Sequence, residues 1–145
     1  MRRGLVDKVV AFLRPAKKRP PTTHDRHGVV IEYSPNIDGD PDPGEVVWTW
    51  VPYEDDPSQG KDRPVVIIGR RGKYLAAVPL TSKRRDEELQ VPVGTGPWDR
   101  EGRPSYAKVE RVLDVDPNQV RREGAILKRK YFDDVVAGVR RARQR

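Results

Sequence analysis

Residues 63–81, RPVVIIGRRGKYLAAVPLT, contain two apolar runs on either side of a basic segment. The first run, 63–69, is rich in valine and isoleucine, and the second, 74–81, ends in Pro-Leu-Thr. Runs of this composition, bounded by glycine or proline, are typical of β-strands. The segment GRRGKY between them does not match a phosphate-binding P-loop, which has four residues between its glycines and Ser or Thr after the lysine. We therefore predict a β-hairpin over residues 63–81.

Further strand signals lie on both sides of this hairpin. They cover residues 28–33, 45–51, 88–93 and 105–116. Only near the C-terminus does the pattern change, because Phe132, Val135, Val136 and Val139 recur at helical spacing and predict a helix near 131–143. Five or more short strands followed by one helix predict a mainly β fold, specifically a small SH3-like barrel over residues 44–116.

The first 43 residues differ in composition from the rest of the chain. Residues 2–14 have one apolar helical face and end at Pro15, which predicts a helix. Residues 15–27 form a basic, proline-rich linker, and an acidic turn follows at 38–45. We therefore divide the chain into an N-terminal segment, 1–43, and a barrel domain, 44–145. Because a linker separates the helix from the barrel, we expect residues 1–27 to be dispensable for chemistry.

Charge is unevenly distributed along the 145 residues, whose net charge is +7. Residues 1–27 carry eight Lys or Arg against two acids, and residues 28–56 carry eight acids and no Lys or Arg. Residues 57–145 carry 21 bases against 12 acids, a balance that favours a polyanionic partner. No apolar run reaches the roughly 18 residues of a membrane span, so we expect no membrane partner and a cytoplasmic location.

Residue types limit the chemistry that the domain can perform. The chain has no cysteine, which excludes disulfides, thiolate metal sites and cysteine nucleophiles. Its two histidines, His24 and His27, both lie in the linker. The barrel domain therefore lacks the histidines of Ser-His-Asp triads and of most zinc sites. We expect no metal and no cofactor, and chemistry that uses hydroxyls, carboxylates and cations.

Arg63 stands where the polar stretch PSQGKD meets the first strand of the hairpin. Two interpretations are open for this residue. A guanidinium held at the edge of a loop is suited to bidentate binding of a phosphate. Alternatively, Arg63 caps one end of the barrel by pairing with one of the many acids.

Four segments resemble the MazF/PemK/Kid family of toxin endoribonucleases. They are GEVVWTWVPY (44–53), PSQGKDRPVVIIG (57–69), YLAAVPLTS (74–82) and YAKVERVLDVD (106–116). The resemblance covers about residues 44–143, and its most specific parts are the Arg-Pro and Leu-Thr-Ser segments.

The resemblance implies an SH3-like barrel, usually a homodimer, that cuts single-stranded RNA without a metal. The neighbouring 2′-hydroxyl would attack, leaving a cyclic phosphate and a 5′-hydroxyl. The catalytic Arg and Thr of the family correspond to Arg63 and Thr81. A cognate antitoxin would neutralise the toxin, and the complex with the antitoxin could bind operator DNA.

Contacts to RNA or antitoxin are expected around these two residues. The candidates are Gln59, Gly60, Lys61, Ser82, Lys83, Arg84, Arg85 and Trp98. The cations that follow Thr81 are well placed to follow an RNA backbone. An exposed Trp50 or Trp98 would offer a stacking surface for a base. Because Trp50 shares a strand face with Val46 and Trp48, we predict that it is buried.

Two other functions fit parts of the pattern. A non-catalytic SH3-like module that binds nucleic acid or protein would keep the basic surface without needing Arg63 and Thr81 together. A gyrase poison of the related CcdB type shares the barrel. That type depends on a tryptophan near its C-terminus, whereas this chain ends in RRARQR.

Overall fold

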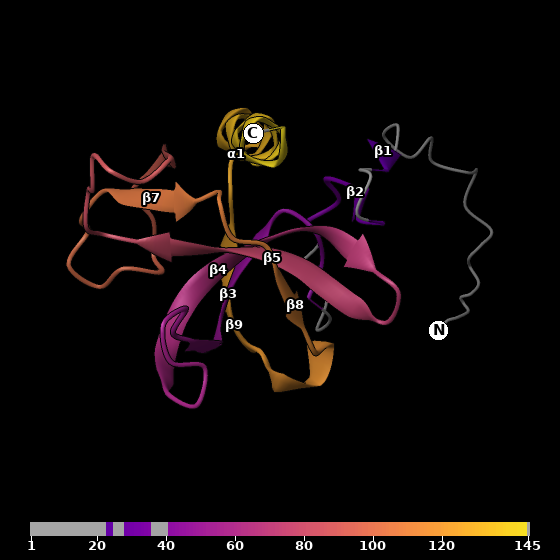
Figure 1. Ribbon diagram of the computed structural model, residues 1–145, viewed down its shortest axis with the longest axis horizontal. Coiled ribbons are helices and arrows are strands. Elements are labelled where there is room, and N and C mark those ends of the chain that lie inside the picture. The colour runs from indigo at the N-terminus through magenta and orange to yellow at the C-terminus, as the bar shows by residue number, and fades with distance from the viewer. Residues whose placement is uncertain (1–22, 25–27, 36–40, 145) are drawn as a thin grey trace.

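The computed structural model describes residues 23–24, 28–35 and 41–144. In these residues the fold is mainly β, with a C-terminal helix, as the sequence predicts (Figure 1). The elements are β1 (Thr23–His24), β2 (Val30–Ile31), β3 (Glu45–Pro52), β4 (Gly60–Arg71), β5 (Tyr74–Thr81), β6 (Gln90–Gly94), β7 (Ser105–Lys108), β8 (Leu113–Val115), a 3-10 turn (Pro117–Gln119), β9 (Arg121–Ile126) and α1 (Arg129–Arg143). The helix predicted at 2–14 and most of the linker lie outside the described residues.

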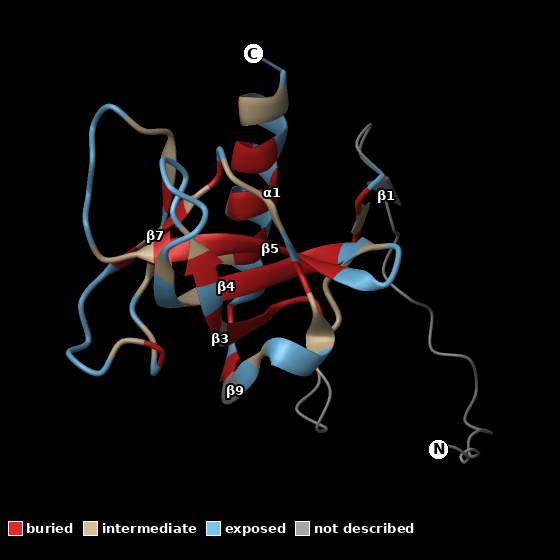
Figure 2. Ribbon diagram, turned by 60° about the horizontal axis from the view of Figure 1, so that its bottom comes forward, coloured by how far each residue is buried: buried red, intermediate tan, exposed pale blue. Residues whose placement is uncertain are grey.

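Strands β4 and β5 form the central hairpin of the fold (Figure 1). They pair antiparallel from Val65 opposite Pro79 to Arg71 opposite Tyr74, which confirms the hairpin prediction. Gly72 lies in the turn with φ +59°, a left-handed conformation that glycine adopts without steric cost. Residues 65–69 are buried, so β4 is covered on both faces where it crosses the centre of the molecule (Figure 2).

The other strands extend this hairpin into a strongly curled antiparallel sheet. Strand β3 pairs with β4, and β9 pairs with β3 on its other edge. On the far side, β8 and β7 pair with different parts of β5, and β6 pairs with β7. A register shift between Val46 and Val47 bends the β3–β9 pair. Together these pairings curl the sheet into a half-barrel.

Helix α1 closes one face of the sheet (Figure 2). Its residues Phe132, Val135, Val136 and Val139 are buried in the main core, which confirms the predicted helix, although it begins at Arg129. A Cβ added to Gly138 would lie 2.7 Å from a Val91 methyl carbon, so glycine allows the helix to approach β6 closely. No helix in the described residues is both long and apolar enough to cross a membrane.

Residues 28–35 pack into the half-barrel although they precede residue 44. Val29 and Ile31 are buried in the main core with residues of α1 and β4. Strand β2 pairs with β4 beside Gly69, where an added Cβ would lie only 1.9 Å from the carbonyl oxygen of Val30. The hydroxyl of Tyr33 donates a 2.8 Å hydrogen bond to the carbonyl of Leu127. In the structure, this part of the N-terminal segment is therefore integral to the folded domain.

Two predictions about strands need correction. The single strand predicted at 105–116 is divided into β7 and β8 by a turn in which the N–H of Arg111 donates to the carbonyl of Lys108. The division lets β5 pair with β7 at one end and with β8 at the other. Strand β9 was not predicted, and it covers the outer edge of β3.

Trp50 is exposed, with 51% of its surface accessible, so the prediction that it is buried was wrong. Val46, Trp48 and Trp50 do alternate along one face of β3, and Val46 is fully buried. However, β9 pairs with β3 only as far as Trp48. At Trp50 this face of the strand has therefore run past the core, whereas Val51 on the other face is still buried.

Candidate active site

A groove of about 780 Å³ opens where β4 and β5 separate. The two strands are paired up to Val65 opposite Pro79. Beyond this point β4 continues with β3, while Leu80 and Thr81 of β5 pair with β7. Residues 61–64 thus form one wall of the groove and residues 80–83 the other, and residues 97–101 of the β6–β7 loop add to the lining.

The groove is strongly basic. Eight cationic side chains line it, namely Lys61, Arg63, Lys83, Arg85, Arg100, Arg103, Lys108 and Arg121. Three acidic side chains, Asp62, Asp99 and Glu101, also lie in the lining. This excess of positive charge favours a polyanionic ligand.

Arg63 and Thr81 line this groove together. Val65 on β4 lies opposite Pro79 on β5, so their side chains share one face of the sheet. Arg63 comes two residues before Val65 and Thr81 two residues after Pro79, so strand alternation places both on that same face. The structure therefore brings together the two residues that the family resemblance singles out.

Arg63 is half-buried and has an unused donor. Its Nε is buried and has no hydrogen-bond partner in the described part of the chain. Burial lowers the pKa of Arg63, and the positive charge of Arg111 lowers it further. The negative charges of Glu54 and Glu88 oppose this lowering of the pKa. The side chain stays charged at neutral pH because the ordinary pKa of arginine lies far above neutrality.

The hydroxyl of Thr81 is oriented by the backbone that follows it. The N–H of Lys83 donates a 3.1 Å hydrogen bond to Thr81 Oγ1. A hydroxyl has one proton and two lone pairs, so accepting this bond leaves the proton free to be donated. Thr81 is partly exposed in the groove and can offer that proton to a bound group.

Lys61 lies two residues before Arg63, on the same face of β4. The charge of Arg63 is the main cause of a lowered pKa at Lys61, with further contributions from burial, Lys83 and Lys108. These cations repel one another in the free protein. An anion bound among them would relieve that repulsion and raise the pKa of Lys61 again.

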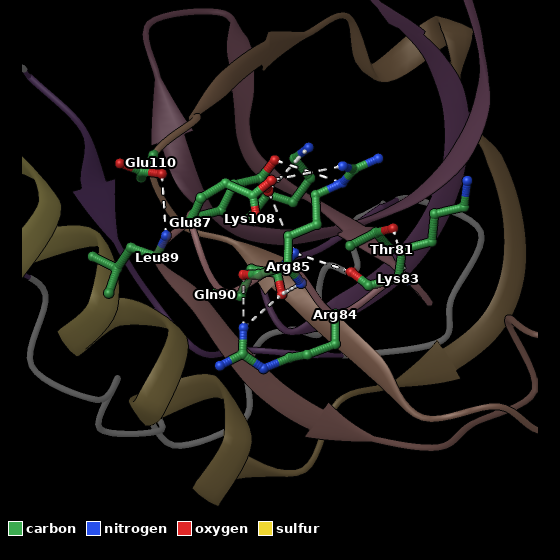
Figure 3. Close-up of polar contacts among 10 residues, drawn as sticks. Thr81, Lys83, Arg84, Arg85, Glu87, Leu89, Gln90, Lys108 and Glu110 are labelled. Atoms are coloured by element: carbon green, nitrogen blue, oxygen red, sulfur yellow. Dashed lines mark hydrogen bonds and ion pairs between the residues drawn. The ribbon is translucent and has the colours of Figure 1, made fainter.

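The loop after Thr81 carries four of the predicted binding residues. Ser82, Lys83 and Arg85 line the groove. Arg84 does not, because its guanidinium lies 5.9 Å from the centre of the Tyr106 ring and bonds to Gln90 instead. Figure 3 shows this loop folded around the side chain of Gln90.

Gln59 and Gly60 do not line the groove. The carbonyl of Gln59 accepts a 2.8 Å hydrogen bond from the N–H of Tyr53, which closes the β3–β4 loop. Gly60 lies under the indole of Trp50, since an added Cβ would come within 2.8 Å of Trp50 Cζ2. These two residues shape the loop beside the groove.

Trp98 cannot serve as an open stacking surface, since only 4% of it is exposed. Its indole N–H donates a 2.9 Å hydrogen bond to the hydroxyl of the buried Ser105. A Cβ on Gly96 would lie 2.1 Å from the Trp98 ring, so glycine leaves room for it. Trp98 thus anchors the β6–β7 loop. Of the two tryptophans considered for stacking on a base, Trp50 is the exposed one.

Sequence reasoning missed several cations of the site. Lys108, on β7, forms a 3.4 Å ion pair with Glu88 and faces the groove. Arg111 lies close enough to Arg63 to lower its pKa, and it is held by donating a hydrogen bond to the carbonyl of Pro52. The positions of Lys108 and Arg111 depend on the division of 105–116 into two strands, which the sequence pattern did not predict.

Comparison with known proteins places this chain in a family. No curated protein sequence matches the chain significantly. Among solved structures, the Mycobacterium tuberculosis toxin MazF-mt6 is similar, with 16% sequence identity and a TM-score of 0.48 over 68% of this chain and 96% of that one. The family model for the PemK-like, MazF-like toxin of type II toxin–antitoxin systems matches residues 42–142. The chain belongs to this family of PemK-like, MazF-like toxins.

Proposed function

We propose that this toxin is an endoribonuclease that cuts single-stranded RNA at the groove between β4 and β5. The observation that carries the proposal is the placement of Arg63 and Thr81 on one face of a basic groove, with an unpaired donor on Arg63. Family membership supports the same conclusion. The proposed reaction takes place where the cell's mRNA is found, in the cytoplasm.

In the proposed reaction the RNA supplies its own nucleophile. The 2′-oxygen attacks the adjacent phosphorus, the bond from phosphorus to the 5′-oxygen breaks, and a 2′,3′-cyclic phosphate and a 5′-hydroxyl remain. One proton leaves the 2′-hydroxyl and one reaches the departing 5′-oxygen. Negative charge increases on the phosphate oxygens in the transition state, so fixed donors that face those oxygens lower the barrier.

Arg63 and Thr81 have distinct roles in this scheme. The guanidinium of Arg63 would bind two phosphate oxygens with parallel N–H bonds, which an ammonium cannot reproduce. The hydroxyl of Thr81 would donate its free proton to the same phosphate. The 2′-hydroxyl supplies the nucleophile and these donors stabilise the charge on the phosphate, so we propose that no metal takes part.

Cleavage of a labelled RNA by the purified toxin tests the proposal. The products should carry a cyclic phosphate and a 5′-hydroxyl, and added chelator should leave the rate unchanged. Binding of RNA without cleavage would favour the non-catalytic module instead.

Lys83 should contribute to RNA affinity through charge. Each phosphate that a protein neutralises on single-stranded RNA contributes about −0.7 to the slope of log K against log salt. Lys83→Ala should therefore make the slope shallower by about that amount. The backbone N–H of residue 83 still bonds Thr81 in this variant, so the variant tests the Lys83 side chain alone. Lys73→Ala, at the exposed turn of the hairpin, is the matched control and should leave the slope unchanged.

Trp50 should hold an unpaired base of the bound RNA beside the groove. One side of its indole covers Gly60, and half of its surface is exposed. Its neighbours on the same face, Trp48 and Asp62, line the groove. Removing a stacking aromatic costs about 1–3 kcal/mol per base, so Trp50→Ala should weaken RNA binding by roughly 5- to 150-fold.

Trp50→Phe is the conservative test of this contact and should retain most of the affinity. Tyr74→Ala is a control, because Tyr74 is also exposed but lies at the opposite end of the hairpin. If Trp50→Ala left RNA binding unchanged and converted a dimer to a monomer, Trp50 would be a subunit contact and the stacking role would be wrong.

We further propose that the toxin is a homodimer whose groove also accepts an acidic segment of a cognate antitoxin. The excess of cations in the groove supports this, since an acidic peptide and RNA would compete for the same charges. Operator DNA would be bound through the toxin–antitoxin complex. Light scattering that gives the mass of one chain at micromolar concentration would contradict the dimer.

A further inference from the structure

The side chain of Gln90 has no unused hydrogen-bonding capacity. Its Nε2 donates to the carbonyl of Lys83 at 3.1 Å and to a carboxylate oxygen of Glu88 at 3.3 Å. Its Oε1 accepts from the backbone N–H of Arg85 at 3.0 Å and from the guanidinium of Arg84 at 3.3 Å. A primary amide has two N–H groups and two lone pairs, so all four positions are used (Figure 3).

These bonds connect the two ends of one loop. The loop, residues 82–89, leaves β5 directly after Thr81 and joins β6 at Gln90. Its last residues are also held to β7 and the turn after it, because Lys108 pairs with Glu88 and Glu110 accepts from the N–H of Leu89 at 3.2 Å. Gln90 is the side chain that reaches back to the first residues of the loop.

A single residue connects Gln90 to Thr81. The carbonyl of Lys83 accepts from Gln90, and the N–H of Lys83 donates to Thr81 Oγ1 at 3.1 Å. Fixing the backbone of Lys83 fixes where its N–H meets the lone pair of the hydroxyl. The direction of the Thr81 O–H bond follows from that, since the proton avoids the lone pair already in use.

We propose that Gln90 is a positioning residue for the Thr81 hydroxyl, acting through the backbone of Lys83. This inference rests on the proposed function, in which Thr81 donates its proton to the scissile phosphate. Gln90 touches neither the RNA nor the reacting atoms in this account. Its contribution is to hold the donor in the direction that the transition state requires.

The first test replaces the amide by an apolar side chain of similar length. Gln90→Met should lower kcat by about 10- to 100-fold, the cost of a small misplacement of a reacting group. KM should change little, because Lys61, Lys83 and Lys108 keep their charges. Gln119→Met is the matched control, since Gln119 is exposed on the 3-10 turn and its side chain has no part in the site.

Coupling to Thr81 distinguishes positioning from a general effect on the loop. In a Thr81→Ala background, Gln90→Met should cause almost no further loss of kcat, because the group it positions is absent. An equal further loss in that background would overturn the proposal. So would a wild-type kcat for Gln90→Met alone.

Gln90→Glu adds a test by pH. The introduced carboxylate can still accept from Arg85, but it faces the Lys83 carbonyl and the Glu88 carboxylate without a proton to donate. The Glu88 carboxylate raises the pKa of the introduced carboxyl group, whereas the guanidinium of Arg84, which bonds the same side-chain oxygen, lowers it. The ratio of variant to wild-type kcat should therefore rise as the pH falls, because the protonated form can donate again. A ratio independent of pH would contradict the need for a donor here.

Hydrogen exchange separates this inference from the proposed function. The amide of Lys83 should exchange faster in Gln90→Met than in the wild type, whether or not the protein cuts RNA. An unchanged rate in a folded variant would overturn the link between Gln90 and Lys83. If the wild type did not cut RNA but the Lys83 amide still exchanged faster in the variant, the proposed function would be wrong. Gln90 would then hold the backbone of Lys83 without any role in catalysis.

Discussion

An RNA with a single 2′-deoxynucleotide on the 5′ side of the cut should not be cleaved at that position. The proposed reaction takes its nucleophile from the 2′-hydroxyl, so removing one oxygen removes the attacking group while the phosphate and the bases stay in place. We expect cleavage there to fall to background, the largest effect in this account. Gel analysis of an end-labelled oligonucleotide with one defined cut site measures it.

Two further oligonucleotides make this result specific. A 2′-methoxy group at the same position keeps the oxygen but blocks its deprotonation, and it should also prevent cleavage. A 2′-deoxynucleotide placed two positions away should leave cleavage nearly unchanged. Cleavage of the deoxy substrate at the normal site would instead require water as the nucleophile, and the proposed mechanism would be wrong.

Arg63→Ala and Thr81→Ala should each leave a folded protein that cuts RNA far more slowly. Losing one preorganised donor to a transition-state oxyanion costs about 10²–10³-fold in kcat. Arg63→Lys should recover only part of the loss, since an ammonium lacks the planar pair of donors. Single-turnover cleavage rates measure these effects.

Matched controls exclude a general loss of stability. Arg141→Ala removes an exposed arginine in the last turn of α1. Thr95→Ala removes an exposed threonine of the β6–β7 loop. Both should cut RNA at the wild-type rate. If Arg63→Ala abolished the cooperative unfolding transition, Arg63 would be a structural residue of the barrel.

The elements that could be predicted are those whose sequence shows one clear hydrophobic pattern. The central hairpin was predictable because residues 65–69 are covered on both faces, so β4 has a continuous apolar run. Helix α1 was predictable because one stripe of its surface meets the core. The division of 105–116 was not, because the turn that separates β7 from β8 has no glycine or proline and depends on pairing with two different parts of β5.

The candidate site could be predicted in part. Arg63 and Thr81 stand at strand ends, where alternation alone places them relative to paired residues such as Val65 and Pro79. The exposures of Trp50 and Trp98 could not be predicted, since they depend on where β9 stops and on how the β6–β7 loop folds back. In each case the deciding contact is made by a residue distant in sequence.

Cleavage by the Arg63→Ala, Thr81→Ala double variant tests the central claim most directly. Both side chains line one groove, and in this account they donate to one phosphate. The folded double variant should show no cleavage above background on an RNA that the wild type cuts. Cleavage at the wild-type rate by this variant would contradict the account, and it would make Arg63 the cap of a barrel end and Thr81 a residue of the loop.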